Sequence, residues 1–301
     1  MFSECPHPRP HPRPHGHING IGKELASILY AANAKVYLAT RSNAKTTAVI
    51  SEIRKAHPHS SGELIHLPLN LDDLSTIKAS TEQFLAAEDR LDVLWNNAAV
   101  MVLPQGSTSV QGYELQYGVN CLGHFLLTSL LHPVLVKTAK EDLQQRGNSV
   151  RVIWVSSSVA DQVPKPAIDF ANMDYQSPDE GIWTKYARSK AGNVLQAVEY
   201  GRQAGKDGII SLTLNPGNFL TGLQRTMPKW QVALFKLVAQ DPRNGAYTEL
   251  FAGLDESITQ KDNGGWVSPY GKLEPVREDL RDPALGRQFW KWCEEQVQPF
   301  L

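Results

Sequence analysis

A tyrosine and a lysine with the spacing needed for proton transfer lie in the segment TKYARSKAGNVL, residues 184–195. Tyr186 and Lys190 are four residues apart, so on a helix they share one face. A tyrosine hydroxyl with its ordinary pKa of about 10 is a poor proton donor and acceptor at neutral pH, and a neighbouring ammonium lowers that pKa because it favours the phenolate. The pair is a candidate general acid and base, although a tyrosine and a lysine on an ordinary surface helix would have the same spacing.

A glycine-rich segment near the N-terminus could hold the phosphates of a nucleotide. Gly16, Gly20, Ile21 and Gly22 precede a run of apolar residues with helical spacing. Glycines let the backbone pass close to a pyrophosphate, and a helix N-terminus supplies N–H donors and the positive end of a dipole. A plain turn before a helix has the same composition, so this motif alone is weak evidence.

Arg41 indicates which dinucleotide such a segment would bind. It follows the short apolar run 35–39, about 20 residues past the glycines, where an acidic residue would hold the ribose 2′-hydroxyl of NAD. An arginine suits the additional 2′-phosphate of NADP, and no carboxylate adjoins Arg41 in the sequence. The sequence therefore predicts NADP, the alternative being a solvent-facing arginine.

Strand-like and helix-like segments alternate along the chain. We expect strands at 35–39, 64–69, 91–95, 151–156 and 209–214, and helices at 20–33, 43–56, 73–87, 110–140 and 183–204. Strands separated by helix-length connections predict a parallel sheet with helices on both faces. The predicted fold is α/β: one doubly wound, Rossmann-like domain over residues 16–301.

The residues before the glycines do not fit this pattern. Residues 1–15 contain a repeated His-Pro-Arg-Pro and are predicted to be a disordered Pro/His-rich segment. In a doubly wound fold the glycine-rich turn follows a buried apolar strand. Proline lacks the N–H that a central strand donates, so the first strand is predicted to be missing or replaced.

Six motifs in sequence order resemble those of the short-chain dehydrogenase/reductases, in their compact branch, and especially the retinol-dehydrogenase-like enzymes and similar reductases of secondary metabolism. The resemblance runs from about residue 16 to the C-terminus. The matching residues are the GxxxGxG loop Gly16–Gly20–Gly22, the Asn-Asn-Ala-Gly-like Asn96–Asn97–Ala98–Ala99, Asn120, Val155–Ser156–Ser157 with Ser157 as the aligned serine, the YxxSK residues Tyr186, Ser189 and Lys190, and Asn215–Pro216–Gly217 with Thr221.

The resemblance implies a role for each catalytic-type residue. Tyr186 would give a proton to a carbonyl oxygen, or take it from an alcohol, and Lys190 would hold the nicotinamide ribose and lower the pKa of Tyr186. Ser157 would bind the substrate oxygen where charge develops, and Asn120 would position a water that links Lys190 to solvent. The implied cofactor is NADP, bound by Gly16, Gly20, Ile21, Gly22, Arg41, Asn70, Asn97, Tyr186, Lys190, Pro216, Gly217 and Thr221.

Three positions depart from the family pattern. His15 stands where the family has threonine, Asn70 where an aspartate accepts from the adenine amino group, and Ala99 where it has glycine. An asparagine keeps an acceptor oxygen but loses the charge. These departures predict weaker cofactor binding with the chemistry retained.

The absent strand is the larger departure, because in this family it lies at the centre of the sheet, between the strands predicted at 35–39 and 91–95. Its loss would leave the facing edges of these two strands without hydrogen-bond partners and the cofactor loop weakly anchored. We favour the interpretation that the chain is a truncated or misassembled reading of a longer gene. A genuine but degenerate paralogue is the alternative.

The composition excludes several other classes of protein. A net charge of −1 with scattered Lys and Arg argues against a nucleic-acid partner or an anionic membrane surface. The three cysteines, Cys5, Cys121 and Cys293, have neither metal-ligand spacing nor the pattern of a disulfide framework. We expect no metal and no transmembrane segment, because no apolar run approaches about 18 residues. With no secretory signal, the expected location is the cytoplasm.

The substrate end is the least specified part of the sequence. The apolar segment 219–240 is expected to form a lid, with Phe219, Leu220, Leu223, Met227 and Trp230 as candidate wall residues or, equally, as core. Phe170 and Trp183 would form the opposite rim. These residues favour a hydrophobic or aromatic ketone, aldehyde or alcohol as the small-molecule partner, and the resemblance makes a homodimer an expectation.

Two other functions remain open at this stage. A catalytically impaired nucleotide-binding relative would keep the fold and lose turnover, and the damaged N-terminus favours it. A sugar-nucleotide epimerase would use the same tyrosine and lysine, but those relatives space the loop glycines differently and carry a larger C-terminal domain.

Overall fold

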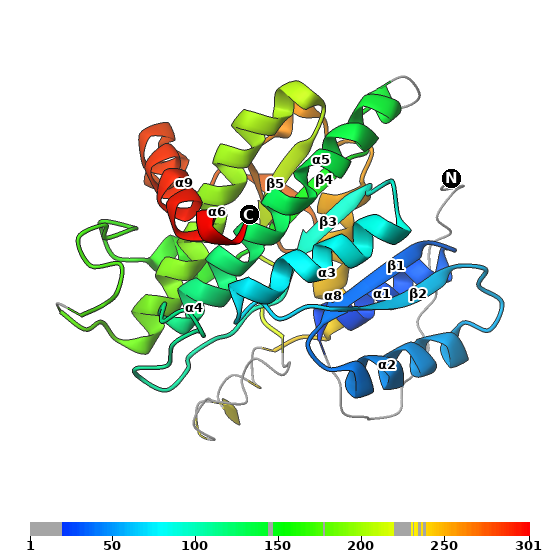
Figure 1. Cartoon of the computed structure of the whole chain (residues 1–301), viewed down its shortest axis with the longest axis horizontal. Helices are drawn as coiled ribbons and strands as arrows, with labels where there is room; N and C mark the ends of the chain where they lie inside the picture. Colours follow the sequence, from blue (N-terminus) through cyan, green and yellow to red (C-terminus); the bar gives the residue numbers. More distant parts are fainter. Residues whose placement is uncertain are drawn as a thin grey trace.

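Parallel strands and helices alternate through the computed structural model, which describes residues 20–143, 147–176, 178–219, 230, 232–233, 236 and 239–301 (Figure 1). The strands are β1 (Lys35–Thr40), β2 (Glu63–Pro68), β3 (Val93–Asn96), β4 (Arg151–Val155), β5 (Ile210–Leu214), β6 (Gly265–Ser268) and β7 (Lys272–Glu274). The main helices are α1 (Ile21–Ala31), α2 (Asn43–Ala56), α3 (Leu74–Ala87), α5 (His124–Leu143), α6 (Ile182–Ala204), α8 (Pro242–Leu254) and α9 (Pro283–Val297). The predicted elements are confirmed to within a few residues, whereas α8, α9 and the edge strand β7 were not predicted.

Local signals explain where several helices begin. Asp241-Pro242 starts α8 and Asp282-Pro283 starts α9: in each case the aspartate side chain accepts from a backbone N–H of the first turn. Proline suits the first helical position because its missing N–H would have no partner there. Ser42 caps α2 in the same way. These caps follow from residue type alone, although of these three helices only α2 was predicted.

The sheet is divided into two parts. One part holds β1 and β2, paired in parallel, and the other has the order β3-β4-β5-β6-β7, parallel except for β7. Within the described residues, β1 and β3 each have one hydrogen-bonded neighbour and do not pair with each other. This break is the consequence predicted for a missing central strand.

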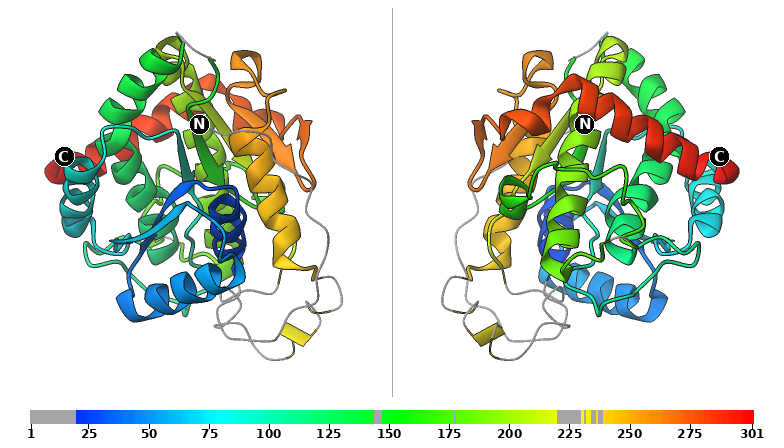
Figure 2. Two further views of the ribbon diagram at one scale, coloured as in Figure 1. Left: turned by 90° about the vertical axis from the view of Figure 1, so that its right-hand side faces the viewer. Right: turned by 90° about the vertical axis from the view of Figure 1, so that its left-hand side faces the viewer.

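Helices cover both faces of the sheet, as predicted. On one face α8 packs against β4 and β5, with α1 beside it (Figure 2). On the other face α3, α5 and α6 pack against the sheet, with α9 next to α6. Strand β4 alternates between the two, since Val152 and Trp154 join the α5 side while Ile153 and Val155 join the α8 side. Its five residues are all buried, so both faces of the sheet are core.

The helix predicted over residues 110–140 is continuous from Leu115 to Leu143 but has three parts. A short α4 (Leu115–Tyr117) and a π-helical segment η1 (Gly118–Gly123) precede α5. The stretch is long enough to cross a membrane, and an 18-residue window of it reaches a mean hydropathy of 1.5. Because 72% of its most apolar window is buried against the rest of the protein, it is a core helix.

Candidate active site

Tyr186 and Ser157 lie in contact at the carboxyl end of β4. Ser157 follows β4 and caps the short 3₁₀ helix η2 (Ser158–Gln162), and Tyr186 is in the second turn of α6. Burial raises the pKa of Tyr186, and the neighbouring Ser157 hydroxyl offsets part of this effect. The neighbouring Ser156 instead donates to the Lys190 carbonyl at 2.8 Å, so Ser157 is the serine whose hydroxyl reaches the tyrosine.

Lys190 is buried one helical turn after Tyr186. Its Nζ lies 5.9 Å from the centroid of the Tyr186 ring and donates to the Val155 carbonyl at 2.7 Å and to Asn193 Oδ1 at 3.3 Å. Burial lowers the pKa of Lys190 to about 8, and Cys121 offsets part of that effect. The Lys190 ammonium is directed at the Val155 carbonyl at the end of β4, and the lowering of the Tyr186 pKa by Lys190 stays a prediction.

Asn120 is held at the centre of the π-helical segment. Its side chain accepts from Val100 N at 2.9 Å and donates to the Val100 carbonyl and to Ser189 Oγ, both at 3.0 Å. Single-turn π-helical segments occur often at functional sites. These contacts tie the loop after β3 to α6, and the role of Asn120 in a water relay stays a prediction.

Three further residues connect the site, and the sequence analysis did not assign them a role. Ser189 accepts from Asn120 and donates to the Tyr186 carbonyl at 2.8 Å, while Asn193 binds both Lys190 and the Asn120 carbonyl. The third is His124, whose Nε2 lies 2.6 Å from the Ala98 carbonyl and whose pKa burial lowers to about 4. The spacing Tyr186–Ser189 and Lys190–Asn193 was the only available signal, since three residues apart means one helix face.

The glycine segment meets β3 through Asn97. Gly20 is the N-cap of α1 and offers no capping side chain, and a Cβ atom on Gly20 would meet nothing within 4 Å. A Cβ on Gly22 would lie 2.7 Å from the terminal amide of Asn97. With its amide oxygen toward the helix, Asn97 accepts from Gly22 N at 3.2 Å and donates to Glu249 Oε1 at 3.1 Å. The open helix start fits an anionic ligand such as a pyrophosphate.

Glu249 of α8 is a buried carboxyl that no sequence motif indicated. Its side chain is fully buried, and burial raises its pKa to about 8. Oε1 faces Asn97, and Oε2 has no hydrogen-bond partner among the described residues. The group is therefore protonated at neutral pH and acts as a neutral support under the glycine segment.

Arg41 and Asn70 line one hollow of about 300 Å³ beyond the ends of β1 and β2. Arg41 is exposed, and its guanidinium lies 4.0 Å from the Asp72 carboxylate, an acid that sequence adjacency did not reveal. Asn70 uses its side-chain oxygen to accept from Asp72 N at 3.4 Å. The hollow has the donors that an adenosine 2′-phosphate needs, with Asp72 as a competitor for Arg41.

Of the remaining predicted cofactor residues, Pro216 and Gly217 lie in the loop after β5. Gly217 follows Pro216 after β5, has φ +106°, and donates from its N–H to Asn215 Oδ1 at 3.1 Å. A residue with a side chain would be strained at that φ. Gly16 and Thr221 lie outside the described residues, as do Leu220, Leu223 and Met227 of the expected lid.

An apolar wall adjoins Tyr186, though only part of it was predicted. Trp183 is partly exposed, and its ring lies 6.4 Å from that of Tyr186 in an edge-to-face arrangement. Met101 and Val102 pack against Tyr186, with Val159 and Ile182 beside them. Phe170 packs against the main core instead, and Phe219 is buried against Gly217 and Gly245. Trp230 is 64% exposed.

Functional side chains thus gather at the carboxyl ends of β3, β4 and β5, next to the start of α1. This is where open parallel sheets with helices on both faces bind nucleotides. Among the described residues no group of three His, Cys, Asp or Glu side chains could hold a metal ion.

Comparisons with known proteins agree with this class of fold. The model of the family "short chain dehydrogenase" matches residues 15–169. The short-chain dehydrogenase/reductase pkfC of Emericella nidulans is 51% identical over 290 residues, 95% of this chain and 92% of that protein. A short-chain dehydrogenase/reductase of Phomopsis amygdali is 46% identical over 301 residues, 95% and 89% of the two chains. The protein belongs to the short-chain dehydrogenase/reductase family of oxidoreductases.

Solved structures show the same fold at lower identity. The NADPH-bound carbonyl reductase from chicken fatty liver superposes with a TM-score of 0.62 at 19% identity, over 85% of this chain and 94% of that one. The 3-ketoacyl-(acyl-carrier-protein) reductase from Brucella melitensis, complexed with NADH, gives 0.62 at 20% identity, over 83% and 91%. The family works with nicotinamide cofactors, and these two structures contain one of each kind.

Proposed function

We propose that the protein is an NADP-dependent oxidoreductase that interconverts a carbonyl group and an alcohol on a hydrophobic small molecule, with Tyr186 as general acid and base. The observation that carries the proposal is that Ser157, at the carboxyl end of β4, and Lys190, with its Nζ 5.9 Å from the Tyr186 ring, both lie beside the buried Tyr186. A buried phenol next to a serine hydroxyl, a buried lysine and an apolar wall has the parts needed to bind and protonate a substrate oxygen.

The cofactor would lie along the carboxyl edge of the sheet. The N-terminus of α1 at Gly20–Gly22 would hold the pyrophosphate, and Arg41 and Asn70 the adenosine end. The Lys190 ammonium and the loop at Gly217 would contact the nicotinamide end. When bound, the nicotinamide supplies or accepts the hydride.

The chain's own residues would handle the proton and the substrate. Ser157 Oγ would donate to the substrate oxygen as negative charge develops there, and Tyr186 would transfer its hydroxyl proton to that oxygen. In the opposite direction Tyr186 would accept the proton of the alcohol. The buried Lys190 charge would favour the phenolate once the active site is closed to water.

The apolar residues around Tyr186 support a hydrophobic substrate. Met101, Val102, Val159, Ile182 and Trp183 offer apolar or aromatic surface next to the hydroxyl. A sugar would need more polar partners than this wall supplies. We extend the proposal to a cytoplasmic, homodimeric enzyme of secondary metabolism, to be tested by fractionation and light scattering.

The test is turnover of NADPH with a panel of aromatic aldehydes and ketones. We expect Tyr186→Phe to lose about 10²–10⁴-fold in turnover because the transferable proton is gone. Tyr200→Phe is the matched control: Tyr200 is on the same helix and equally buried, but its hydroxyl binds His132 at 3.0 Å. Equal activity in the two variants would refute the role of Tyr186.

A nucleotide-binding relative without turnover is the second candidate, and the divided sheet favours it. Helix α1 is followed directly by β1 in the chain. Among the described residues, no strand pairing links β1 to β3. Micromolar NADPH binding together with no turnover on any substrate of the panel would support this candidate over the enzyme.

A further inference from the structure

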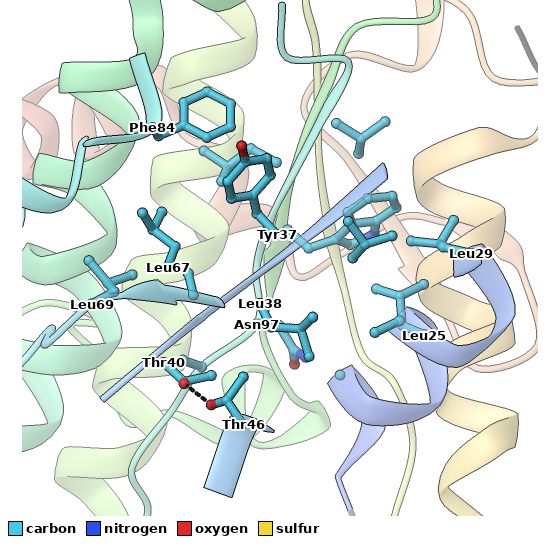
Figure 3. Close-up of a pocket in the computed structure, with 18 of the residues that line it drawn as sticks. Leu25, Leu29, Tyr37, Leu38, Thr40, Thr46, Leu67, Leu69, Phe84 and Asn97 are labelled. Carbon is cyan, nitrogen blue, oxygen red and sulfur yellow. Dashed lines mark hydrogen bonds between the residues drawn. The ribbon is translucent and has the colours of Figure 1, made fainter. Parts of the chain in front are cut away.

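The apolar wall beside Tyr186 has two sides that come from separate parts of the chain. Val102 belongs to the loop after β3, and Ile182 is the first residue of α6, one helical turn before Tyr186. Both pack in the apolar cluster that contains the Tyr186 ring. None of these residues lines the cavity of about 800 Å³ between β1 and β3, where Tyr37 and Phe84 lie (Figure 3), so the wall is separate from the break in the sheet.

Val102 has a backbone conformation that a valine rarely adopts. Its φ is +51°, in the left-handed region, although its side chain is branched at Cβ and buried. Such a conformation persists only where the surrounding structure fixes it, and residues of this kind are concentrated at functional sites. A return to negative φ would redirect the valine side chain. Whatever holds this backbone therefore also holds one side of the wall.

The side-chain amide of Gln116, in α4, binds both sides of the wall by their backbones. Its Oε1 accepts from Val102 N at 2.9 Å, and its Nε2 donates to the Ile182 carbonyl at 3.3 Å. Nε2 also donates to Glu114 Oε1 at 3.1 Å, and Gln116 is 1% exposed. Because a backbone N–H can only donate, the amide oxygen must face Val102, and the amide has one orientation.

We propose that Gln116 is a positioning residue that determines how large a substrate can approach Tyr186. Its amide keeps Val102 at φ +51° and ties the loop after β3 to the start of α6, so it fixes the separation between the two sides of the wall. Without the amide Val102 relaxes, and bulky ketones gain access to the Tyr186 hydroxyl. The inference rests on the proposed carbonyl reduction at Tyr186 and adds the residue that selects among its hydrophobic substrates.

The first test compares two substrates of the full chain with NADPH, an aryl methyl ketone and its tert-butyl homologue. The size ratio is kcat/KM for the methyl ketone divided by kcat/KM for the tert-butyl ketone. Methionine has nearly the length of glutamine but makes neither backbone bond. We expect Gln116→Met to lower the size ratio at least about 10-fold, as a change of pocket size does elsewhere. The change should lie mainly in the KM of the tert-butyl ketone, with kcat for the methyl ketone little changed.

Gln111→Met is the matched control for a lost glutamine amide. Gln111 makes the same kinds of bonds at the start of α3, where it accepts from Leu74 N at 3.1 Å and donates to Asp73 Oδ1 at 2.8 Å. Its replacement should lower the Tm and leave the size ratio at the native value. An equal fall of the size ratio in the two variants would show that general loosening, and not the position of the wall, controls substrate size.

A double variant separates the position of Val102 from other effects of the lost amide. Glycine is unstrained at positive φ and has no side chain to place in the wall. In a Val102→Gly protein, Gln116→Met should therefore lower the size ratio less than it does in the native protein, because both substitutions remove the same feature. A further fall as large as that in the native protein would overturn the proposal.

Hydrogen exchange of the Val102 amide tests the contact without cofactor or turnover. We expect this amide to exchange at least about 10-fold faster in Gln116→Met, as for the loss of one hydrogen bond, and at the native rate in Gln111→Met. Unchanged exchange, or an unchanged size ratio in an active Gln116→Met, would overturn the role of Gln116 alone. A native protein that reduced no carbonyl compound would instead refute the proposed function, and with it any selection of substrates.

Discussion

The side-chain amide of Asn97 reaches the buried carboxyl of Glu249 at 3.1 Å, and the same amide holds Gly22 at the start of α1. The contact joins β3, α1 and α8, which are distant in the sequence. It makes the glycine segment depend on a carboxylic acid that must stay neutral, because burial raises the pKa of Glu249 to about 8.

The Glu249 carboxyl should make stability depend on pH. Its folded pKa of about 8 is above its usual value of 4.5, so the unfolded chain loses the proton first as the pH rises. The free energy of unfolding should therefore fall between about pH 4.5 and pH 8. The glutamine of Glu249→Gln is neutral over the whole range. We therefore expect the Tm of this variant, measured relative to that of the native protein, to increase as the pH rises from about 5 to about 9.

Thermal melts across this pH range measure the difference. The exposed Glu256→Gln serves as the matched control on the turn after α8, and its Tm difference from the native protein should change little with pH. A Glu249→Gln difference that is equally constant would contradict the assignment of Glu249 as a buried neutral acid.

Replacing each of the two adjacent serines with alanine should have a different effect on turnover and on stability. Ser157→Ala removes the hydroxyl that contacts Tyr186, so we expect turnover to fall about 10²–10³-fold with little change in Tm. Ser156→Ala removes the buried bond to the Lys190 carbonyl, so we expect a loss of about 1 kcal/mol in stability and a smaller loss of rate. Steady-state kinetics and thermal melts on both variants decide the matter, and the opposite pattern would make Ser156 the functional serine.

Cofactor affinity should fall at alkaline pH, because Lys190 then loses its positive charge. Burial lowers the pKa of Lys190 to about 8, so the charge is present below about pH 8 and is lost above it. NADPH affinity, measured by fluorescence titration, should fall as the pH rises through about 8. Lys190→Met should bind weakly with little pH dependence over this range, whereas the exposed Lys206→Met should keep the native profile. A native affinity that is flat to pH 9 would argue against a role for this charge.

The two glycines at the start of α1 should differ in their tolerance of alanine. Gly22→Ala would place a methyl group 2.7 Å from the Asn97 amide, which Glu249 holds in place. We expect about 1–3 kcal/mol of lost NADPH binding or stability, as for other overpacked sites. Gly20→Ala meets nothing within 4 Å and should lose less in both NADPH titrations and thermal melts. Equal losses would show that Asn97 moves freely.

Arg41 should set the preference between the two nicotinamide cofactors. Arg41→Ala removes the guanidinium proposed for the 2′-phosphate, so we expect NADPH to bind about 10–100-fold more weakly with NADH little changed. Asp72→Asn removes the carboxylate 4.0 Å from Arg41 and should strengthen NADPH binding by a few-fold. Titrations of both variants with both cofactors test this, and a parallel loss of NADPH and NADH in Arg41→Ala would place the 2′-phosphate elsewhere.

The sequence by itself determined the elements and the family. The strands at residues 151–155 and 210–214 are mostly apolar, and Ser42, Asp241 and Asp282 begin helices for local reasons of residue type. Proline at alternate positions before the glycines was enough to predict a divided sheet. All of these signals act over a few residues, through backbone hydrogen bonding and side-chain periodicity.

Only the tertiary structure decided which side chains meet across elements. It directed the Ser156 hydroxyl to the Lys190 carbonyl, aimed Lys190 at the Val155 carbonyl, and placed Asp72 beside Arg41. It also put Glu249 beside Asn97 and left a cavity of about 800 Å³ between β1 and β3. Such contacts depend on how helices and strands pack at separations of tens to hundreds of residues, and neither residue type nor spacing carries that information.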